Sequence, residues 1–466
     1  MVNPKITLPL CNNLHRKPIV FNNNKNFDMK QLFFALFLGA FAFPLVAQEP
    51  EPYQFKEFKH VACTPVKNQE QTGTCWCFSA LSFLESECLR VGKGESNLSE
   101  MFVVRNTYRQ KCENYVRRQG TAQLGEGGLA HDLINAVRQY GIVPEEAYPG
   151  RSDLGKPYNH SKLEEKLKKL CGDLVVLGKK GKLPNDWIGS VDSLLDAEFG
   201  KVPPSFNANN KKFTPTQYRD FLGLNMDDYV TITSFTHHPF YQSFVLEVPD
   251  NFSNGLFYNL PLDEMMRCLN FSLQQGYSVE WDADVSNDGF AAKYGMALVP
   301  AKEWKDKNDA QRAGTFKNVE EEKAVAQDYR QQMFDRQETM DDHLMHIVGI
   351  LDEPHNGVFY QVKNSWGPIS DQKGFVNTSE QYMRLNTISF TVNKYALPVD
   401  VRRRLGLEPG EANIRRQGMP GRPNGPMEMR QIEPGRPGQD RQGSSPEKRQ
   451  VTPAPKGKKA VETKDE

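Results

Sequence analysis

TPVKNQEQTGTCWCFSALSFLESE, Thr64 to Glu87, carries the strongest structural signal in the chain. Cys75 and Cys77 flank one tryptophan, a gap too short for a metal pair and one residue short of the Cys-x-x-Cys redox spacing. A Thr-Gly-Thr turn precedes Cys75, and the apolar side chains after it recur at helical spacing. The stretch therefore predicts a turn that leads into a helix, with Cys75 in the first helical turn.

That position has a chemical consequence for Cys75. A thiol at the first turn of a helix lies at the positive end of the helix dipole, which lowers its pKa and favours the nucleophilic thiolate. Gln69 lies close enough upstream to aim its side-chain amide at the same point, and with the Cys75 backbone N–H it would hold the negative oxygen of a tetrahedral intermediate. The alternative is that Cys75 is an ordinary buried cysteine, the role that we expect for Cys77.

A thiolate catalyst needs a base, and a second stretch provides one. HLMHIVGIL (343–351) and VFYQVKNSW (358–366) flank an Asn-Gly hairpin signal. Pairing across that turn places residues whose numbers sum to about 709 opposite each other, so His343 lies diagonal to Asn364. An asparagine carbonyl that accepts the imidazole N–H would orient the ring toward the thiol, and Trp366 would shield that bond from water. Alone, His343 is as well explained as a surface histidine and Asn364 as a turn former.

Composition excludes some classes of protein. The 466 residues carry zero formal net charge, so nothing favours nucleic acid as a partner. Eight cysteines in this length are neither a disulfide framework nor a metal-cluster density. His237 and His238 precede a proline, with no cysteine or carboxylate at ligand spacing, and we expect a loop there. We therefore expect no metal and no organic cofactor.

The two ends of the chain differ from its middle. MKQLFFALFLGAFAFPLVAQ begins at Met29 and predicts a signal peptide over 29–47, with an apolar run too short for a stable membrane anchor. We therefore expect an exported protein, and we interpret residues 1–28 as an upstream extension before a true start at Met29. Residues 407–466 are rich in Pro, Gly and Arg and predict a disordered tail.

Four blocks, in order, resemble the signature of papain-like cysteine peptidases. They are PVKNQEQTGTCWCFS (65–79), EGGLAHDLINAVRQYGIVPEEAYP (126–149), DDHLMHIVGI (341–350) and YQVKNSWG (360–367). The spacing from histidine to glycine in the third block gives the catalytic place to His343 and puts His346 inside a strand. By this resemblance Cys75, His343 and Asn364 are catalytic, Gln69 lies in the oxyanion hole, Trp366 shields the triad, and Gly127 and Gly128 hold the substrate backbone.

The closer resemblance is to the bleomycin hydrolase and aminopeptidase C branch. Thr72 stands where ordinary papain relatives carry a disulfide cysteine, and a long region at about 150–280 is similar to the insertion of that branch. The resemblance implies an α+β papain-like fold over 48–406, with a helical half, a β-barrel-like half and the branch insertion. It also implies thiol peptidase activity on peptide substrates, usually releasing N-terminal residues, and often homo-hexamers.

The C-terminus departs from that branch. Its members end in an arm whose terminal carboxylate captures the amine of the substrate, whereas this chain runs on past Gly406. Either the tail is cut off, or the cleft stays open to blocked and internal peptides, as in an endopeptidase; the sequence alone slightly favours the second. If activity is confined to free N-termini, Asp282 or Asp284 is a candidate for another acidic anchor. A catalytically inactive binding protein on this fold is the remaining alternative.

Overall fold

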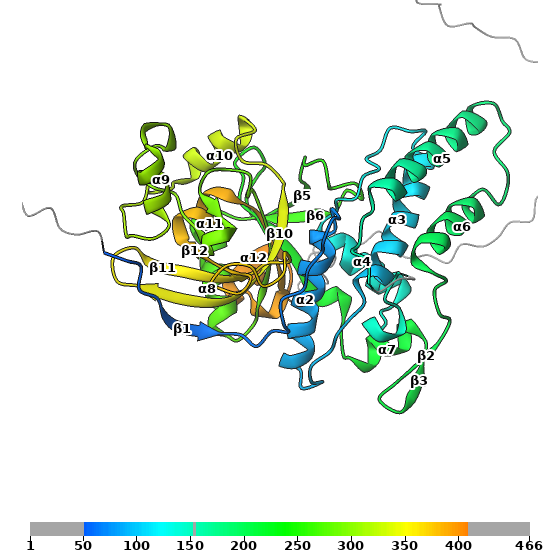
Figure 1. Ribbon diagram of the computed structural model, residues 1–466, viewed down its shortest axis with the longest axis horizontal. Helices are drawn as coiled ribbons and strands as arrows, with labels where there is room; N and C mark the ends of the chain where they lie inside the picture. The colour runs from blue at the N-terminus through cyan, green and yellow to red at the C-terminus, as the bar shows by residue number, and fades with distance from the viewer. Residues whose placement is uncertain (1–50, 152–154, 409–466) are drawn as a thin grey trace, which may run out of the picture. The chain divides into compact units, whose positions relative to one another are not determined.

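The computed structural model describes residues 51–151 and 155–408 (Figure 1). The predicted upstream extension, the signal peptide and the tail beyond Glu408 lie outside the described residues. Within the described ranges, no helix combines the length and the apolar character that a membrane crossing requires.

Helices dominate the first half of the described chain. Amphipathic patterns of period 3.6 bury their apolar faces in one shared core. The helices of this half are α2 Cys75–Arg90, α3 Glu100–Arg117, α4 Ala130–Tyr140, η1 Glu145–Ala147, α5 Ser161–Lys179, α6 Ile188–Phe199, α7 Pro215–Phe221 and η2 Met226–Asp228, and a hairpin of β2 Phe206–Ala208 and β3 Lys211–Phe213 lies beside α7.

The second half is built on one large, mostly antiparallel sheet with its own core. Its strand order is β5-β6-β4-β13-β7-β10-β11-β12-β9-β8, and β1 pairs with β10 off this path. The strands are β1 Lys56–His60, β4 Tyr229–Thr233, β5 Ser243–Val245, β6 Leu256–Asn259, β7 Val279–Ala283, β8 Phe290–Ala291, β9 Met296–Ala297, β10 His343–Glu353, β11 Gly357–Lys363, β12 Phe375–Ser379 and β13 Thr387–Asn393. The helices of this half are α8 Leu262–Gln274, η3 Ala292–Tyr294, η4 Trp304–Asp306, α9 Asp309–Thr315, α10 Gln327–Asp335, α11 Glu380–Asn386, η5 Lys394–Ala396 and α12 Val399–Leu405. Together the two halves give the α+β papain-like architecture that the sequence predicts.

The β10–β11 hairpin has the predicted register. His346 pairs with Lys363, and Ile347 with Val362, so their numbers sum to 709 as expected. A bulge between Ile347 and Gly349 shifts the remaining pairs by one. Gly357 closes the turn with a φ of 75°, a conformation that glycine adopts without strain.

Helix α2 joins the two halves, because it belongs to the helical core and packs against β10 and β7 (Figure 1). The region predicted as an insertion, about 150–280, does not form a separate unit. Its first part supplies α5, α6 and α7 to the helical half, whereas its second part supplies β4 and β6 to the sheet and leads into β7. β7 lies between β10 and β13, so the boundary at about 280 falls inside a central strand.

The seven cysteines of the described ranges are free thiols. Cys88, Cys112, Cys171 and Cys268 are buried, as expected of core thiols, and Cys63 is half-buried. Cys77 is fully buried, and its thiol points to the carbonyl of Glu100 at 3.4 Å.

Candidate active site

Cys75 is the first residue of α2 and is almost buried, with 8% of its surface exposed. The backbone N–H of Leu344 lies near its sulfur and lowers the pKa of the thiol, although burial outweighs this effect. Leu344 follows His343 at the start of β10, so the helix start and the strand start meet at this thiol. The structure thus places the predicted nucleophile near the start of β10, the strand that begins with the predicted base.

His343 is hydrogen-bonded to Asn364, as the hairpin register predicts. Nε2 of the imidazole lies 2.7 Å from Oδ1 of Asn364, which also accepts the backbone N–H of Ser365 at 2.7 Å. With the Asn364 oxygen as acceptor, Nε2 carries a proton and Nδ1 is left as the free base. The Trp366 ring lies 4.6 Å from the imidazole centroid at an interplanar angle of 33°, and it covers one face of His343.

The protonation of the pair differs from the expectation for a helix N-terminus. Burial raises the pKa of the Cys75 thiol to about 12, and the nearby carboxyls of Asp250 and Asp341 add to the rise. Burial also lowers the pKa of His343 to about 4, although the bond to Asn364 opposes this shift. Desolvation therefore outweighs the helix dipole at Cys75, and burial favours the neutral form of both groups.

Gln69 is buried between the turn before α2 and the segment after β11 that carries Asn364. Its Nε2 donates to the Thr72 carbonyl at 2.7 Å, and its Oε1 accepts from the Ser365 hydroxyl at 2.6 Å. Its backbone N–H also donates to the Ser365 carbonyl at 2.8 Å. These bonds fix the amide and leave its second N–H for the oxygen of a bound carbonyl.

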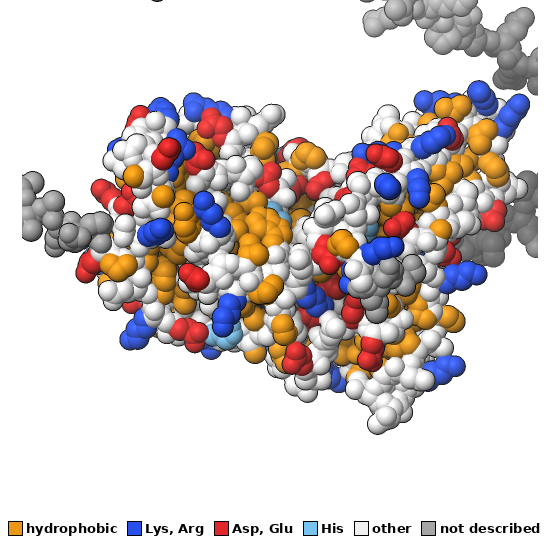
Figure 2. Space-filling model, viewed as in Figure 1, with side chains coloured by type: hydrophobic (Ala, Val, Ile, Leu, Met, Phe, Trp, Pro, Cys, Tyr) orange, Lys and Arg blue, Asp and Glu red, His pale blue; other side chains and the backbone are white. Residues whose placement is uncertain are grey.

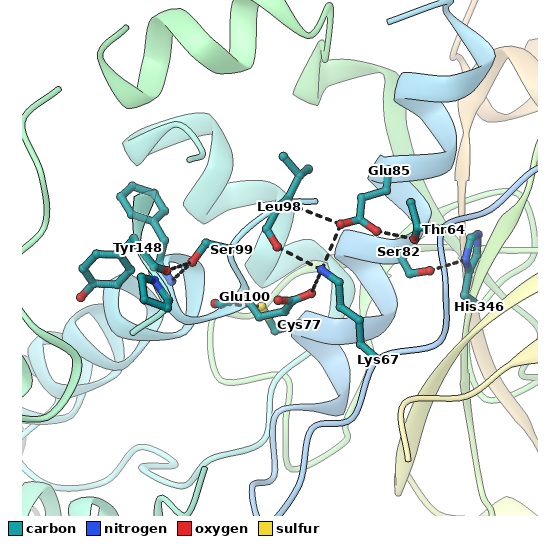
Figure 3. Close-up of polar contacts among 12 residues, drawn as sticks. Thr64, Lys67, Cys77, Ser82, Glu85, Leu98, Ser99, Glu100, Tyr148 and His346 are labelled. Carbon is teal, nitrogen blue, oxygen red and sulfur yellow. Dashed lines mark hydrogen bonds and ion pairs between the residues drawn. The ribbon is translucent and has the colours of Figure 1, made fainter. Parts of the chain in front are cut away.

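A buried polar network, which the sequence analysis did not identify, holds the loop that carries Gln69 (Figure 3). The Lys67 ammonium lies 3.1 Å from the Glu85 carboxylate on α2 and 2.6 Å from that of Glu100 on α3. It also donates to the Leu98 carbonyl at 3.2 Å, and Glu85 accepts from the Thr64 hydroxyl at 2.5 Å. The signal for this network in the sequence is weak, since charged residues on helices are ordinarily exposed.

His346 belongs to the same network and lies away from Asn364. Its Nδ1 lies 2.8 Å from the hydroxyl of Ser82 (Figure 3). The Ser82 hydroxyl also accepts a hydrogen bond from Lys363 at 2.7 Å. Burial and the nearby Lys363 charge lower its pKa well below the ordinary value. His346 is therefore a neutral packing residue in β10.

Gly127 and Gly128 lie before α4, where close contacts leave no room for a side chain. A Cβ built on Gly127 would lie 1.9 Å from a carboxylate oxygen of Asp250, and one on Gly128 would lie 3.2 Å from the Trp76 indole. The Gly127 carbonyl accepts a hydrogen bond from the Lys111 ammonium. Packing alone thus requires glycine here; the expected contact with a substrate backbone stays a prediction.

A group of carboxyls beside Cys75 was not predicted as a set. Asp250, Asp282 and Asp341 all raise the pKa of the Cys75 thiol, although they come from three separate segments. Asp282 is on β7 directly opposite Leu344, and Asp341 lies just before β10. The sequence places the three far apart, so only the folded chain reveals the group.

The fold places His237 and His238 next to a carboxylate, that of Glu247, which their spacing in the sequence does not predict. Glu247 lies 3.3 Å from Nε2 of His237 and 2.9 Å from Nε2 of His238. Gln331 donates to Nδ1 of His237 at 3.0 Å, while its oxygen accepts from the backbone N–H of Thr236. That arrangement leaves the His237 proton on Nε2, facing Glu247, which suits a hydrogen-bonded loop better than a metal ion.

The chain matches the family model described as "Peptidase C1-like family" over residues 47–414. This protein belongs to the peptidase C1-like family. The match spans both halves of the fold, and the geometry around Cys75 lies inside it. The chain is accordingly a cysteine-type peptidase by family.

Individual relatives in the peptidase C1-like family are distant in sequence. Aminopeptidase C of Lactococcus lactis subsp. cremoris is 23% identical over 371 residues, which cover 71% of this chain and 80% of that relative. Aminopeptidase G of Lactobacillus delbrueckii subsp. lactis is 23% identical over 387 residues, covering 74% and 84%. The crystal structure of pepw from Lactobacillus rhamnosis HN001 matches with a TM-score of 0.59 at 19% identity, covering 76% of this chain and 85% of that one. The structural match supports the papain-like fold.

Proposed function

We propose that this protein is a cysteine aminopeptidase in which Cys75, His343 and Asn364 form the catalytic triad. The observation that carries the proposal is the His343–Asn364 hydrogen bond of 2.7 Å beside a thiol at the start of α2. A nucleophile, a base and a group that orients the base are the minimum set for acyl transfer through a thioester.

The reaction begins with a peptide carbonyl at the Cys75 sulfur. The thiol proton passes to Nδ1 of His343 as the sulfur attacks, which relieves the cost of a buried thiolate. The second Gln69 N–H and the Cys75 backbone N–H bind the oxyanion. His343 then returns the proton to the leaving amine, and a water molecule, deprotonated by the same imidazole, releases the acyl group.

The position of Asp250 favours an aminopeptidase over an endopeptidase. Its carboxylate lies against the backbone of Gly127, where an extended substrate would otherwise run beside the glycine pair. Gln123 holds that carboxylate with a hydrogen bond of 2.9 Å. The relatives named aminopeptidase C and aminopeptidase G also support an aminopeptidase. The sequence alone slightly favours the other alternative, an open cleft, because the chain continues past Gly406.

The experiment compares a dipeptide substrate with its N-acetylated form, using wild type and Cys75→Ala. We expect cleavage of the free peptide only, and none by Cys75→Ala. Equal cleavage of both peptides would establish the endopeptidase. No cleavage, together with no labelling of Cys75 by a thiol-directed epoxide, would favour the inactive binding protein.

We also propose that the protein is exported and assembles as a homo-hexamer. The support is the signal-like segment 29–47 and the resemblance to the aminopeptidase C branch. Mass spectrometry of the native protein tests export through a new N-terminus at Gln48, and it also reports whether the tail is intact. Sedimentation of the same sample tests the oligomer.

A further inference from the structure

The carboxyls beside Cys75 lack the partners that buried acids require. Asp282 is fully buried, and neither of its side-chain oxygens has a hydrogen-bond partner; Oδ2 of Asp341 is likewise buried and unpartnered. A buried carboxylate without a donor or a counter-ion is strongly unfavourable, and evolution retains such groups chiefly at functional sites.

The residues near Asp282 make a negative charge on its carboxyl still less favourable. After burial, the strongest influences on its carboxyl are the acids Asp341, Glu280 and Asp250, all of which raise its pKa. The Asp282 and Asp341 carboxyls lie within hydrogen-bonding reach of each other, so the empty site can hold one shared proton between them. One proton cannot satisfy three orphaned oxygens.

The second acid on the same strand is different. Asp284 accepts hydrogen bonds from the backbone N–H groups of Met340 at 2.8 Å and Ser286 at 3.0 Å, and from the Asn287 amide at 3.0 Å. Its oxygens are used in holding the turn that follows β7. Of the two aspartates on this segment, Asp282 alone is poised for a ligand.

The group of carboxyls lies near the place where the N-terminus of a bound peptide would be. Asp282 faces Leu344 across the β7–β10 ladder, and the Leu344 backbone N–H lies near the Cys75 sulfur. Paired strands lie about 4.8 Å apart, and one residue of extended chain advances roughly 3.5 Å. A peptide whose first carbonyl lies at the sulfur therefore brings its terminal amine close to these carboxyls. Figure 2 shows acidic side chains on the surface between the two halves, so the surrounding face also favours a cation.

We propose that Asp282 and Asp341, with Asp250 beside them, form the site that binds the protonated N-terminal amine of the substrate. An ammonium has three N–H donors, one for each of the three orphaned oxygens. Such a site requires no chain terminus to hold the amine. This inference rests on the proposed aminopeptidase function and assigns its specificity.

The test uses the full chain and two substrates, alanine 4-methylcoumaryl-7-amide and its N-acetyl form. Charge-assisted hydrogen bonds of this kind correspond to roughly 10- to 100-fold in binding. We expect Asp282→Asn and Asp341→Asn to lower kcat/KM on the free amine by that factor, mainly through KM, and to leave the acetylated substrate unchanged or improved. Glu353→Gln removes a buried carboxyl at the far end of β10 and is the matched control, with no change in preference expected.

A binding measurement separates recognition from turnover. In the Cys75→Ala background, calorimetry with alaninamide and N-acetylalaninamide should show a preference for the free amine that Asp282→Asn removes. Where Asp282→Asn does not fold, Asp250→Asn, at a half-buried position, replaces it. If wild type prefers the free amine and folded aspartate variants keep that preference, the assignment is wrong while the aminopeptidase stands. If wild type shows no preference at all, the aminopeptidase proposal fails first.

Discussion

The imidazole of His343 and the side-chain oxygen of Asn364 lie 2.7 Å apart, at the first residue of β10 and just after the last residue of β11, two strands that a single tight hairpin joins. The bond needs no long-range assembly, because the hairpin register fixes it. The Cys75 sulfur comes from α2, which belongs to the core of the helical half. The position of the proposed base is thus fixed locally, whereas that of the proposed nucleophile depends on the packing of α2 against β10.

The assignment of the nucleophile can be tested with two neighbouring cysteines. Cys75→Ala should abolish peptide hydrolysis, because it removes the sulfur that is proposed to attack the peptide carbonyl. Cys77→Ala should keep most of the turnover and lower the melting temperature, since that side chain is fully buried. Hydrolysis assays and thermal melts of both variants decide the matter; an active Cys75→Ala would refute the assignment.

The two histidines of β10 should behave differently. His343→Ala should reduce kcat by roughly 10²- to 10⁴-fold with little change in melting temperature, as the loss of a general acid–base usually does. His346→Ala should lower the melting temperature, because it empties a buried site and removes the Ser82 contact. Equal losses of kcat in both variants at an unchanged melting temperature would contradict this distinction.

A methyl group at Gly127 should loosen the selection of free N-termini. Gly127→Ala places a Cβ where the Asp250 carboxylate lies, so Asp250 must move. We expect the ratio of kcat/KM on free and acetylated substrates to fall by about tenfold or more, with a stability cost of about 1–3 kcal/mol.

Gly172→Ala is the matched control for that change. Gly172 lies inside α5, and its added Cβ meets nothing within 4 Å. Alanine there should stabilise the helix by about 0.5–1 kcal/mol and leave the substrate ratio untouched. A Gly127→Ala enzyme that retained the wild-type ratio would show that Asp250 does not limit the length of the bound peptide.

The buried carboxyl of Glu280 should make stability depend on pH. Burial raises its pKa to about 8, against roughly 4.3 in the unfolded chain, so the folded state holds the proton more tightly. Its contribution is complete below the unfolded value and is lost as the pH rises through about 8. We expect Glu280→Gln, which keeps a neutral acceptor for Ser79, to melt higher than wild type at pH 9 by at least ~2 °C.

At pH 5 the difference between the two proteins should be small, because Glu280 is still protonated in the folded protein and this pH lies only slightly above the unfolded pKa of roughly 4.3. Melting curves at several pH values provide the measurement. Asp341 and Glu322, with pKa values raised by burial to about 7, titrate in a neighbouring range, so the variant should retain part of the wild-type slope. A Glu280→Gln protein that is less stable than wild type at pH 9 would contradict the sign.

The part of the site that could be predicted from the sequence is the part that depends on local patterns. The helix from Cys75, the hairpin and the His343–Asn364 bond follow from periodicity, turn chemistry and register, which act over short stretches. The position of β7 between β10 and β13 could not be predicted from such patterns, because strand order in a sheet depends on long-range packing. The acid group depends on that order, since Asp282 reaches Cys75 only through β7.

Burial accounts for the one electrostatic expectation that was wrong. A helix N-terminus lowers the pKa of a thiol when water still reaches it, and the sequence contains no measure of how much water does. In the folded chain Cys75 is 8% exposed and surrounded by acids, so the direction reverses. The same long-range packing that assembles the site therefore sets its charge.

The raised pKa of Cys75 also affects how readily oxidants attack its sulfur. Peroxides and disulfides react with thiolates far faster than with thiols, and access to the sulfur limits them further. A sulfur that is 8% exposed and has a pKa of about 12 offers such oxidants almost no thiolate at neutral pH. The thiol loses its proton only when the sulfur attacks the carbonyl of a bound peptide. We therefore expect Cys75 to stay reduced in aerobic surroundings without a reducing partner.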